Sequence, residues 1–213
     1  MRILVVGASH GIGLEATRRA LEAGHDVRAF ARSAPDMPLV HERLQKVRGD
    51  ALDADDVSAA LDGVNAVLLT LGIPANQLFR PVTLFSAATQ VLVAAMQARG
   101  VRRLIAVTGF GAGASKPSIS VLQRWPYELV FGRAYADKGV QERLIEQSGL
   151  DWTIVRPGVL TGGPRTGRYR VLESPATWRN GIISRADVAD FLVRQLDERR
   201  YVGAAPVLIR HGL

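Results

Sequence analysis

Three glycines near the start of the chain have the spacing of a phosphate-binding turn. Gly7, Gly11 and Gly13 follow the apolar run of residues 2–6 and precede an amphipathic stretch over residues 14–23. In a strand–turn–helix unit, such glycines permit a sharp turn, close approach of a pyrophosphate and tight helix packing, and the helix N-terminus attracts anions. A glycine-rich turn without a ligand is the alternative, but the order of elements favours a dinucleotide site. The residues assigned to it are Gly7, Ser9, His10, Gly11, Ile12 and Gly13.

The residues after the second predicted strand, residues 26–31, carry positive charge. Arg32 and Ser33 stand there, and the one acidic residue of the strand is Asp26 at its start. An acidic residue at this place would bond the ribose 2′-hydroxyl of NAD, whereas a guanidinium pairs with the 2′-phosphate of NADP. His10 could lie beside the same phosphate. A solvated surface arginine is the alternative for Arg32, but the charge favours NADP(H) as the cofactor.

Short apolar runs alternate with amphipathic stretches along the whole chain. This alternation predicts an α/β fold: a single-domain, Rossmann-like, doubly wound and mostly parallel sheet of about seven strands, with helices on both faces, over residues 1–213. The ligand of such a sheet lies across the carboxyl ends of its strands. The expected strands cover residues 2–6, 26–31, 44–48, 66–69, 103–107, 152–156 and 206–209. The expected helices cover residues 14–23, 54–61, 84–99, 136–148 and 185–199.

The composition excludes several classes of chemistry. The 213-residue chain contains no cysteine, which rules out disulfides, thiolate catalysis and cysteine-ligated metals. Its four histidines are scattered without metal-ligand spacing, so no metal site is expected. The N-terminus reads as the first strand and not as a signal peptide, and no apolar run approaches membrane-spanning length. We therefore expect a cytoplasmic protein with no membrane partner.

The net charge of +7 comes almost entirely from arginine. Of the 27 basic residues, the lysines are Lys46, Lys116 and Lys138. The arginines are dispersed and no recognition motif accompanies them, so no nucleic-acid partner is expected. Attraction for a polyanionic cofactor or an acidic substrate explains the charge, and so does a simple compositional bias. The oligomeric state stays open between a monomer and a homodimer.

Several motifs, in the right order, resemble those of one superfamily. The chain resembles the short-chain dehydrogenase/reductase superfamily in its glycine spacing, G-x-x-x-G-x-G. The resemblance extends to the Lys138–Glu142 pair and to the runs of residues 148–158 and 183–189. They resemble in particular its atypical branch, which includes NmrA-like proteins and the biliverdin reductase B/flavin reductase group. The resemblance extends from the first predicted strand to the last predicted helix and implies a single NAD(P)-binding domain.

The resemblance also implies cofactor-binding residues in the later loops. A Gly-Asp-x-x-Asp segment frames the adenine in the superfamily, which assigns Asp50 and Ala51 to the cofactor; the alternative is a helix start with Asp53 as its N-cap. The backbone of Leu71 and Gly72 is expected to pass close to the cofactor riboses. The segment expected against the nicotinamide consists of Pro157, Gly158, Val159 and Leu160.

Three residues are candidates for catalysis. Thr108 falls where the superfamily keeps a hydroxyl that bonds a substrate carbonyl; alternatively, it caps a glycine turn. The common enzymes use Tyr-x-x-x-Lys, but Tyr135 precedes Lys138 by three residues and Ala134 occupies the position of the usual tyrosine. Residues three apart still share roughly one helix face, so Tyr135 remains a candidate acid. In the atypical branch the lysine bonds the nicotinamide ribose; the alternative for Lys138 is an ordinary surface ion pair with Glu142.

Residues 115–133 and residues 162–181 are expected to form a small substrate-side region. Their aromatic residues and arginines suit a flat, partly anionic molecule; alternatively, Trp125 and Phe131 are core and the arginines are solvated. The function that follows is an NADPH-dependent oxidoreductase that transfers hydride to a small-molecule acceptor such as a flavin or quinone. The alternative is a non-catalytic NADP(H)-binding redox sensor of the NmrA-like type. A sugar-nucleotide epimerase or dehydratase is disfavoured, because those relatives normally keep the tyrosine register.

Overall fold

The computed structural model describes residues 1–73, 82–118 and 121–210, with the backbone alone for residues 121–131. Strands and helices alternate along it, as the sequence predicts. The strands are β1 (Arg2–Val6), β2 (Asp26–Phe30), β3 (Leu44–Val47), β4 (Ala66–Leu69), β5 (Arg103–Val107), β6 (Asp151–Pro157), β7 (Val159–Thr161), β8 (Tyr169–Leu172), β9 (Ile182–Ser184) and β10 (Val207–Arg210). The α-helices are α1 (Gly11–Glu22), α2 (Ala54–Ala60), α3 (Leu84–Ala98), α4 (Val121–Glu146) and α5 (Arg185–Asp197).

Eight of these strands form one sheet in the order β3-β2-β1-β4-β5-β6-β10-β8. All neighbours are parallel except β8, which runs antiparallel to β10 at the edge. The chain builds outward from β1 to β3 and then returns to β4 on the other side of β1, so the direction of winding reverses between β1 and β4. This is the strand order of a doubly wound nucleotide-binding sheet, and the predicted fold class is confirmed.

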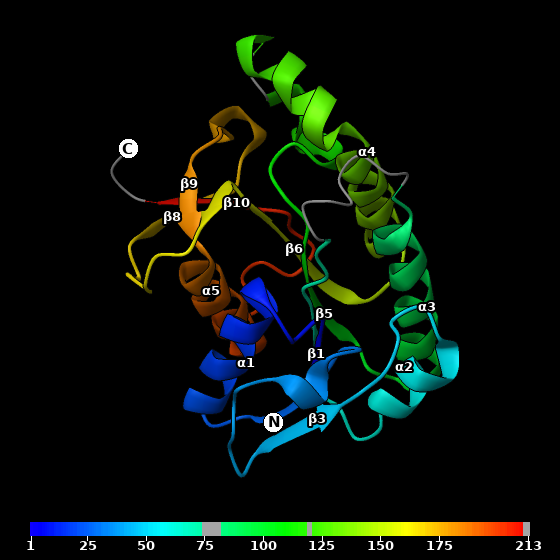
Figure 1. The fold of residues 1–213 in the computed structure, drawn as a ribbon. Coiled ribbons are helices and arrows are strands. Elements are labelled where there is room, and N and C mark those ends of the chain that lie inside the picture. The colour runs from blue at the N-terminus through cyan, green and yellow to red at the C-terminus, as the bar shows by residue number, and fades with distance from the viewer. Residues whose placement is uncertain (74–81, 119–120, 211–213) are drawn as a thin grey trace.

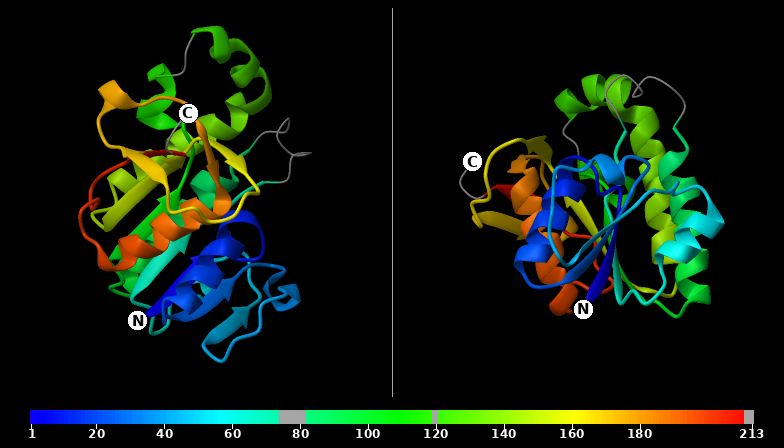
Figure 2. Two further views of the ribbon diagram at one scale, coloured as in Figure 1. Left: turned by 90° about the vertical axis from the view of Figure 1, so that its left-hand side faces the viewer. Right: turned by 60° about the horizontal axis from the view of Figure 1, so that its bottom comes forward.

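Helices cover both faces of the sheet (Figure 1). Helices α1 and α5 pack side by side on one face, and α2, α3 and α4 cover the other; the views in Figure 2 agree. Side chains of β1 alternate between the two layers: Ile3 and Val5 join the core beneath α1 and α5, while Leu4 and Val6 join the core on the opposite face. Because both faces are covered, the central strands β1, β4 and β5 consist of apolar residues, apart from Arg2 and Arg103 at the starts of β1 and β5.

Two parts of the structure differ from the sequence-based expectation. Helix α4 begins at Val121, whereas the expected helix began at residue 136; Pro126 lies in the early part, and proline disfavours a helix interior. Three short strands were also missed. β7 and β9 form a separate parallel pair, and β8 extends the edge of the main sheet. β7 and β9 have three residues each, too few for their periodicity to be recognised.

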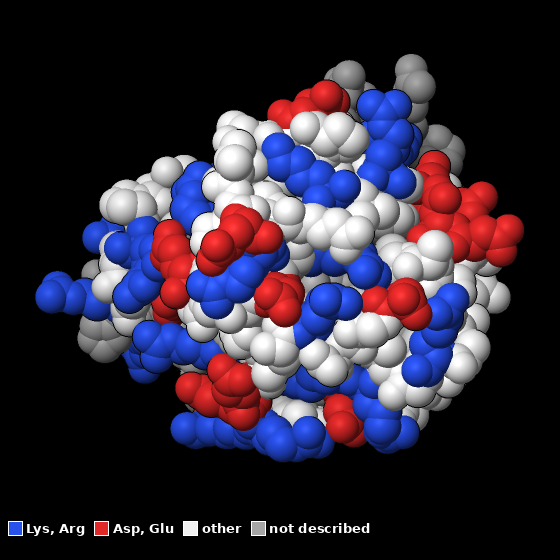
Figure 3. All heavy atoms as spheres, turned by 90° about the horizontal axis from the view of Figure 1, so that it is seen from below, with Lys and Arg blue, Asp and Glu red and all other residues white. Residues whose placement is uncertain are grey.

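Exposed charges of both signs are mixed on the face seen in Figure 3, where lysine and arginine side chains alternate with acidic ones. Several exposed arginines form ion pairs, including Arg18–Glu15, Arg99–Asp62 and Arg199–Asp151. This face therefore carries no continuous basic surface. Over the ranges that the structure describes, no helix is both long enough and apolar enough to cross a membrane.

Candidate functional site

The predicted loops emerge together at the carboxyl edge of the sheet. The last residues of β1, β2 and β4 lie side by side, because Val6 pairs with Phe30 on one side and with Leu69 on the other. β5 and β6 extend the parallel sheet beyond β4, so the loops after these strands leave the same edge. The reversal of winding between β1 and β4 lies at its centre, which is where ligands bind in this kind of sheet.

The loop after β1 requires glycine for its geometry. Gly7 has a left-handed φ of 82°, and a Cβ on Gly13 would lie only 2.1 Å from the carbonyl oxygen of Gly7. His10 is the N-cap of α1, but its side chain makes no capping hydrogen bond; instead its Nδ1 lies 2.9 Å from Ser9 Oγ. The loop therefore folds tightly under the start of α1 without covering it.

The N-terminus of α1 is open to an anion. The N–H groups of Gly11, Ile12 and Gly13 have no acceptor among the hydrogen bonds of the described residues, and the first turn holds no acidic side chain. Such free N–H groups, together with the helix dipole, favour a phosphate. The cradle thus fits the pyrophosphate of a dinucleotide at the residues that the glycine spacing indicated.

Arg32 is exposed immediately after β2. Within the described ranges its guanidinium makes no ion pair or hydrogen bond, even though Asp36 lies in the following 3-10 turn, η1 (Ala34–Asp36). Ser33 is half-buried and is the N-cap of that turn without a side-chain hydrogen bond. Both side chains are therefore available to a ligand, as a 2′-phosphate site requires.

The segment after β3 is held by local hydrogen bonds. Asp50 Oδ1 accepts a hydrogen bond from Leu52 N at 3.0 Å, and Asp50 N donates to Asp56 Oδ2 at 2.9 Å. Asp53 caps α2 by accepting two backbone hydrogen bonds at 3.0 and 2.9 Å, so the helix-start interpretation is confirmed. Asp50 and Ala51 are half-buried, and their role at the adenine stays a prediction.

The loop after β4 is fastened to the glycine loop. The hydroxyl of Thr70 donates to the carbonyl oxygen of Val6 at 2.8 Å. Leu71 is half-buried and Gly72 is exposed, and no atom of the described residues would lie within 4 Å of a Cβ on Gly72. The backbone at Gly72 is thus open to a ligand at the edge of the sheet.

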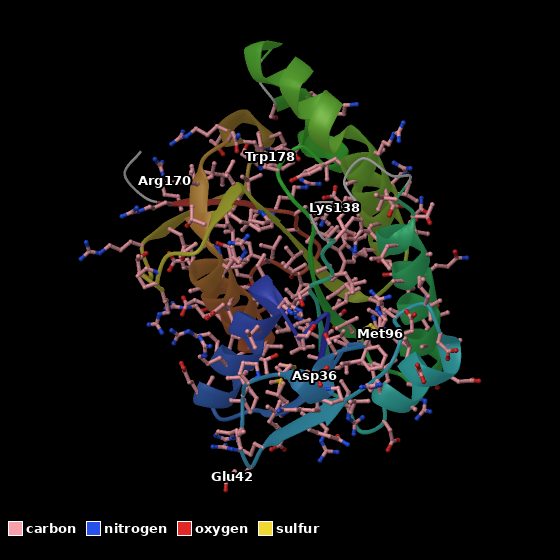
Figure 4. The ribbon with its side chains drawn as sticks, viewed as in Figure 1. Asp36, Glu42, Met96, Lys138, Arg170 and Trp178 are labelled. Atoms are coloured by element: carbon pink, nitrogen blue, oxygen red, sulfur yellow. The ribbon has the colours of Figure 1, made fainter. Side chains whose placement is uncertain are left out.

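Helix α4 directs two side chains at the loop after β5. Lys138 Nζ donates to the carbonyl oxygen of Thr108 at 2.9 Å and lies 4.3 Å from the centre of the Phe85 ring. A Cβ on Gly109 would lie 2.7 Å from the Tyr135 hydroxyl oxygen, so this hydroxyl lies against the next residue of the loop. The three-residue spacing keeps both groups on one side of the helix. Figure 4 shows Lys138 on the side of α4 that faces the sheet.

Part of the hydrogen-bonding capacity of the Lys138 ammonium is used within the protein. Burial lowers the pKa of Lys138 to about 8, while the negative charges of Glu142 and Asp137 act in the opposite direction. Asp137 itself caps α3, because its Oδ2 accepts from Phe85 N at 2.8 Å. Within the described residues, Lys138 Nζ makes one further hydrogen bond, a long one of 3.5 Å to the carbonyl of Val107. An ammonium has three N–H donors, so Lys138 retains one donor for a ligand.

Glu142 pairs with Arg156 and not with Lys138, so the surface ion-pair interpretation is wrong. Its carboxylate accepts hydrogen bonds from Arg156 Nε at 2.9 Å and from Arg156 Nη2 at 2.8 Å, and both side chains are buried. The hydroxyl of Thr108 also donates to Glu142 Oε1, at 2.6 Å. A hydroxyl carries one proton, so in this arrangement Thr108 cannot donate to an acceptor carbonyl. This differs from the expected role of Thr108 and makes it a candidate positioning residue.

The segment after β6 crosses another backbone closely. A Cβ on Gly158 would lie 2.2 Å from the carbonyl oxygen of Gly181, and Val159 N donates to that same oxygen at 2.7 Å. Pro157 is buried at the end of β6, Val159 is exposed and Leu160 is half-buried. The four residues expected at the nicotinamide thus lie at the carboxyl edge, where β7 begins.

The aromatic side chains of residues 162–181 are used within the fold. The Trp178 ring lies 4.8 Å from Arg156 Cζ, and its Nε1 donates to Leu172 O at 3.0 Å (Figure 4). The Tyr169 hydroxyl donates to Asp190 at 3.0 Å. The core alternative concerned Trp125 and Phe131, whose side chains lie outside the described residues, so it stays a prediction. Exposed arginines on this side are Arg165, which pairs with Asp190, and Arg168, Arg170 and Arg179.

Acidic side chains near the edge are also used within the protein. Asp187 accepts hydrogen bonds from Thr166 N at 2.7 Å and from Gly167 N at 2.8 Å, which holds the loop before β8. Ser184 caps α5 by accepting from Asp187 N at 3.0 Å. Nowhere in the described ranges do three or more histidine or acidic residues gather as metal ligands.

Two features escaped the sequence analysis. The first is the buried Glu142–Arg156 pair, because the spacing of four residues pointed to Lys138 as the partner. The second is Arg185, the first residue of α5, which lies beside Gly11. Its only signal was its place directly after the helix cap Ser184, inside the run of residues 183–189 that carried the resemblance.

A doubly wound sheet with an open glycine loop at its switch point defines a Rossmann-type nucleotide-binding protein. The family described as NAD(P)H-binding matches residues 7–199, and the chain belongs to this family. The membership confirms the resemblance to atypical short-chain dehydrogenases/reductases and confirms the predicted class of cofactor.

The chain is similar to several known proteins. The structure of ChuY, an anaerobillin reductase from Escherichia coli O157:H7, superposes with a TM-score of 0.82 at 26% identity and covers 100% of this chain and 98% of that one. An uncharacterized sugar epimerase of Bacillus subtilis, YhfK, is 28% identical over 93% of this chain and 89% of its own length. An NAD(P)H azoreductase of Xenophilus azovorans is 29% identical over 73% of this chain and 47% of its own length.

Proposed function

We propose that the protein is an NADPH-dependent reductase that transfers hydride to a flat, partly anionic acceptor of the flavin or quinone class. One observation carries the proposal: the open N-terminus of α1 and the ammonium of Lys138 lie at the same carboxyl edge of the sheet. In doubly wound sheets the dinucleotide spans this edge, with its pyrophosphate at the glycine loop. Its nicotinamide would then lie near the loops after β5 and β6.

The names of two relatives support a reductase. ChuY, which matches this chain over nearly its whole length, is named an anaerobillin reductase. The Xenophilus protein is named an NAD(P)H azoreductase, and this chain spans about half of it. Neither name specifies a flavin or a quinone, so the acceptor class of this chain rests on its own residues.

The preference for NADPH over NADH rests on Arg32. This exposed guanidinium has no partner in the described ranges and follows β2, where the ribose of the adenosine is bound in such folds. A planar guanidinium binds a phosphate through two parallel hydrogen bonds. Ser33 and His10 would add further donors to the same 2′-phosphate.

The residues of the chain would bind, orient and protonate. When bound, the nicotinamide supplies the hydride. Lys138 would use its remaining N–H donor to hold the nicotinamide ribose, and Thr108 would hold the loop after β5 through Glu142. The hydroxyl of Tyr135, against Gly109, would deliver the one proton that a flavin or quinone takes up in addition to the hydride. Reduction of such acceptors needs little beyond this positioning.

The acceptor is proposed to bind on the side formed by residues 162–181. Of the four exposed arginines of this segment, Arg165 pairs with Asp190, and the other three give the segment positive charge: Arg168, Arg170 and Arg179. Arginine favours anionic and planar groups, because its guanidinium forms paired hydrogen bonds and stacks on π systems. Since Trp178 and Tyr169 are used inside the fold, we assign the selection of an anionic acceptor to these arginines rather than to an aromatic surface.

The redox-sensor alternative is favoured by a different observation. The Thr108 hydroxyl is committed to Glu142, and Tyr135 stands three rather than four residues before Lys138. A protein that only senses NADP(H) needs neither an oriented hydroxyl nor an acid.

The test is NADPH consumption by the purified protein with menadione and with FMN, under anaerobic conditions so that oxygen does not reoxidise the products. The proposal predicts turnover with at least one of them and a strong loss in the Lys138→Met variant. Tight NADPH binding without turnover across a wider panel of quinones and flavins would favour the sensor. Conversion of a sugar nucleotide without net NADPH consumption would instead support an epimerase, as the name of YhfK suggests.

A further inference from the structure

Arg185 lies at the meeting point of two helix N-termini. It is the first residue of α5, and Gly11 is the first residue of α1. A Cβ on Gly11 would lie 3.8 Å from Arg185 Nε and 3.9 Å from Arg185 Cδ. The arginine side chain therefore runs past the start of α1, where the free N–H groups of the glycine loop stand.

Arg185 is half-buried as a residue, yet its side chain makes no ion pair or hydrogen bond within the described part of the chain. The acids nearest to it along α5 are engaged elsewhere. Asp187 accepts hydrogen bonds from the backbone of Thr166 and Gly167, and Asp190 pairs with Arg165 at 3.3 Å and with Arg194 at 3.0 Å. A partly desolvated arginine without a carboxylate is costly unless an anion joins it.

We infer that Arg185 binds the pyrophosphate of the cofactor from beside the glycine loop, next to Gly11. The N–H groups of α1 would hold one side of the diphosphate, and the fork of the guanidinium would bond its other oxygens. The inference shares its cofactor site with the proposed function, but it is independent of the acceptor and of any turnover.

Arg185 and Arg32 would then recognise different parts of one ligand. Arg32 follows β2 and is assigned to the 2′-phosphate, which NADH lacks. Arg185 faces the glycine loop, and its ligand, the diphosphate, is common to NADPH and NADH. Substitution of Arg32 is therefore expected to change the ratio of the NADPH and NADH affinities. Substitution of Arg185 is expected to leave this ratio unchanged.

The experiment measures calorimetric Kd values of NADPH and NADH for the wild type, Arg185→Gln, Arg185→Lys and the control Arg99→Gln. Arg99 is an exposed arginine paired with Asp62 at the far end of α3, so its variant removes the same charge away from the site. Arg185→Gln is expected to raise both Kd values by the same factor, roughly 10- to 100-fold. Arg185→Lys should raise both by a smaller common factor, and Arg99→Gln should change neither.

Thermal unfolding without nucleotide checks the fold of each variant. Because Arg185 has no partner within the described residues, Arg185→Gln should keep the wild-type Tm and lose part of the stabilisation by NADPH. If Arg185→Gln lowers the Tm without nucleotide, the affinities of Arg185→Lys become the test, because lysine keeps the charge and most of the aliphatic part of the side chain. A common rise in both Kd values at an unchanged Tm then supports the inference.

Three results would overturn the inference. Unchanged affinity for both nucleotides in the Arg185 variants would remove Arg185 from the site. A loss confined to NADPH would move Arg185 to the 2′-phosphate. Failure of the wild type to bind either nucleotide would overturn the proposed function as well, whereas the first two results leave that function standing.

Discussion

The hydroxyl oxygen of Thr108 lies 2.6 Å from Glu142 Oε1, inside the protein and below the carboxyl edge of the sheet. The same carboxylate is bonded twice by Arg156, so one buried acid ties the loop after β5 to α4 and to β6. Lys138, one helical turn before Glu142, is thereby left to the carbonyl of Thr108. The loop after β5 is thus held from inside the protein by the buried pair of Glu142 and Arg156.

The substitution Glu142→Gln is expected to lower the free energy of unfolding by about 3 kcal/mol, because it leaves the buried guanidinium of Arg156 without its counter-charge. Urea denaturation followed by circular dichroism measures the change. Asp62→Asn, which breaks the exposed pair with Arg99, serves as the control and should cost less than about 1 kcal/mol. Equal losses of unfolding free energy in the two variants would contradict a stabilising role for the buried Glu142–Arg156 pair.

Thr108→Val is expected to lower turnover less than about ten-fold, since its hydroxyl proton is directed at Glu142 and not at the acceptor. The loss should appear in kcat and KM together, as for a residue that positions a loop. The measurement is steady-state NADPH oxidation with the acceptor found to be active. A fall in kcat of two orders of magnitude at unchanged stability would instead assign to Thr108 a direct hydrogen bond to the acceptor.

Arg32→Ala is expected to weaken NADPH binding by roughly 10-fold or more and to leave NADH binding within about two-fold, because the 2′-phosphate alone distinguishes the two nucleotides. Fluorescence titration with each nucleotide gives the two Kd values. Arg18→Ala, which removes an exposed arginine of α1 paired with Glu15, controls for the loss of positive charge. Parallel losses for NADPH and NADH would place the 2′-phosphate elsewhere.

The affinity for NADPH is expected to fall as the pH rises through about 8, the value to which burial lowers the pKa of Lys138. Below this pH the ammonium is protonated and can donate to the ribose; above it the free protein has lost that charge, so a ligand that prefers the ammonium binds less well. Calorimetry from roughly pH 7 to roughly pH 9.5 covers the transition. In Lys138→Met the affinity should be lower and independent of pH in this window; a wild-type-like slope in that variant would exclude Lys138 as its source.

Much of the fold follows from local patterns. The glycine loop, the parallel strands β1 to β6 and the caps Asp53 and Ser184 are each determined by residues within a few positions of one another. Such features are readable from the sequence because the geometry that requires a glycine or a cap is local.

The interior of the site is different, because its contacts join distant segments. Glu142 has two basic residues within reach along the sequence, Lys138 four residues before it and Arg156 fourteen residues after it. In the folded protein Glu142 pairs with Arg156, because β6 places this arginine beside α4. Arg185 reaches Gly11 from the far end of the chain, because α1 and α5 lie side by side (Figure 1). No spacing rule links these residues, so their roles become visible only in the folded protein.

Calorimetric titration of the wild-type protein with NADPH and with NADH tests the central claim most directly. The arrangement of the glycine loop, Arg32 and Lys138 at one edge predicts that both nucleotides bind at one site per chain, with NADPH tighter by roughly 10-fold or more. Absence of binding, or a clear preference for NADH, would contradict this account of the site.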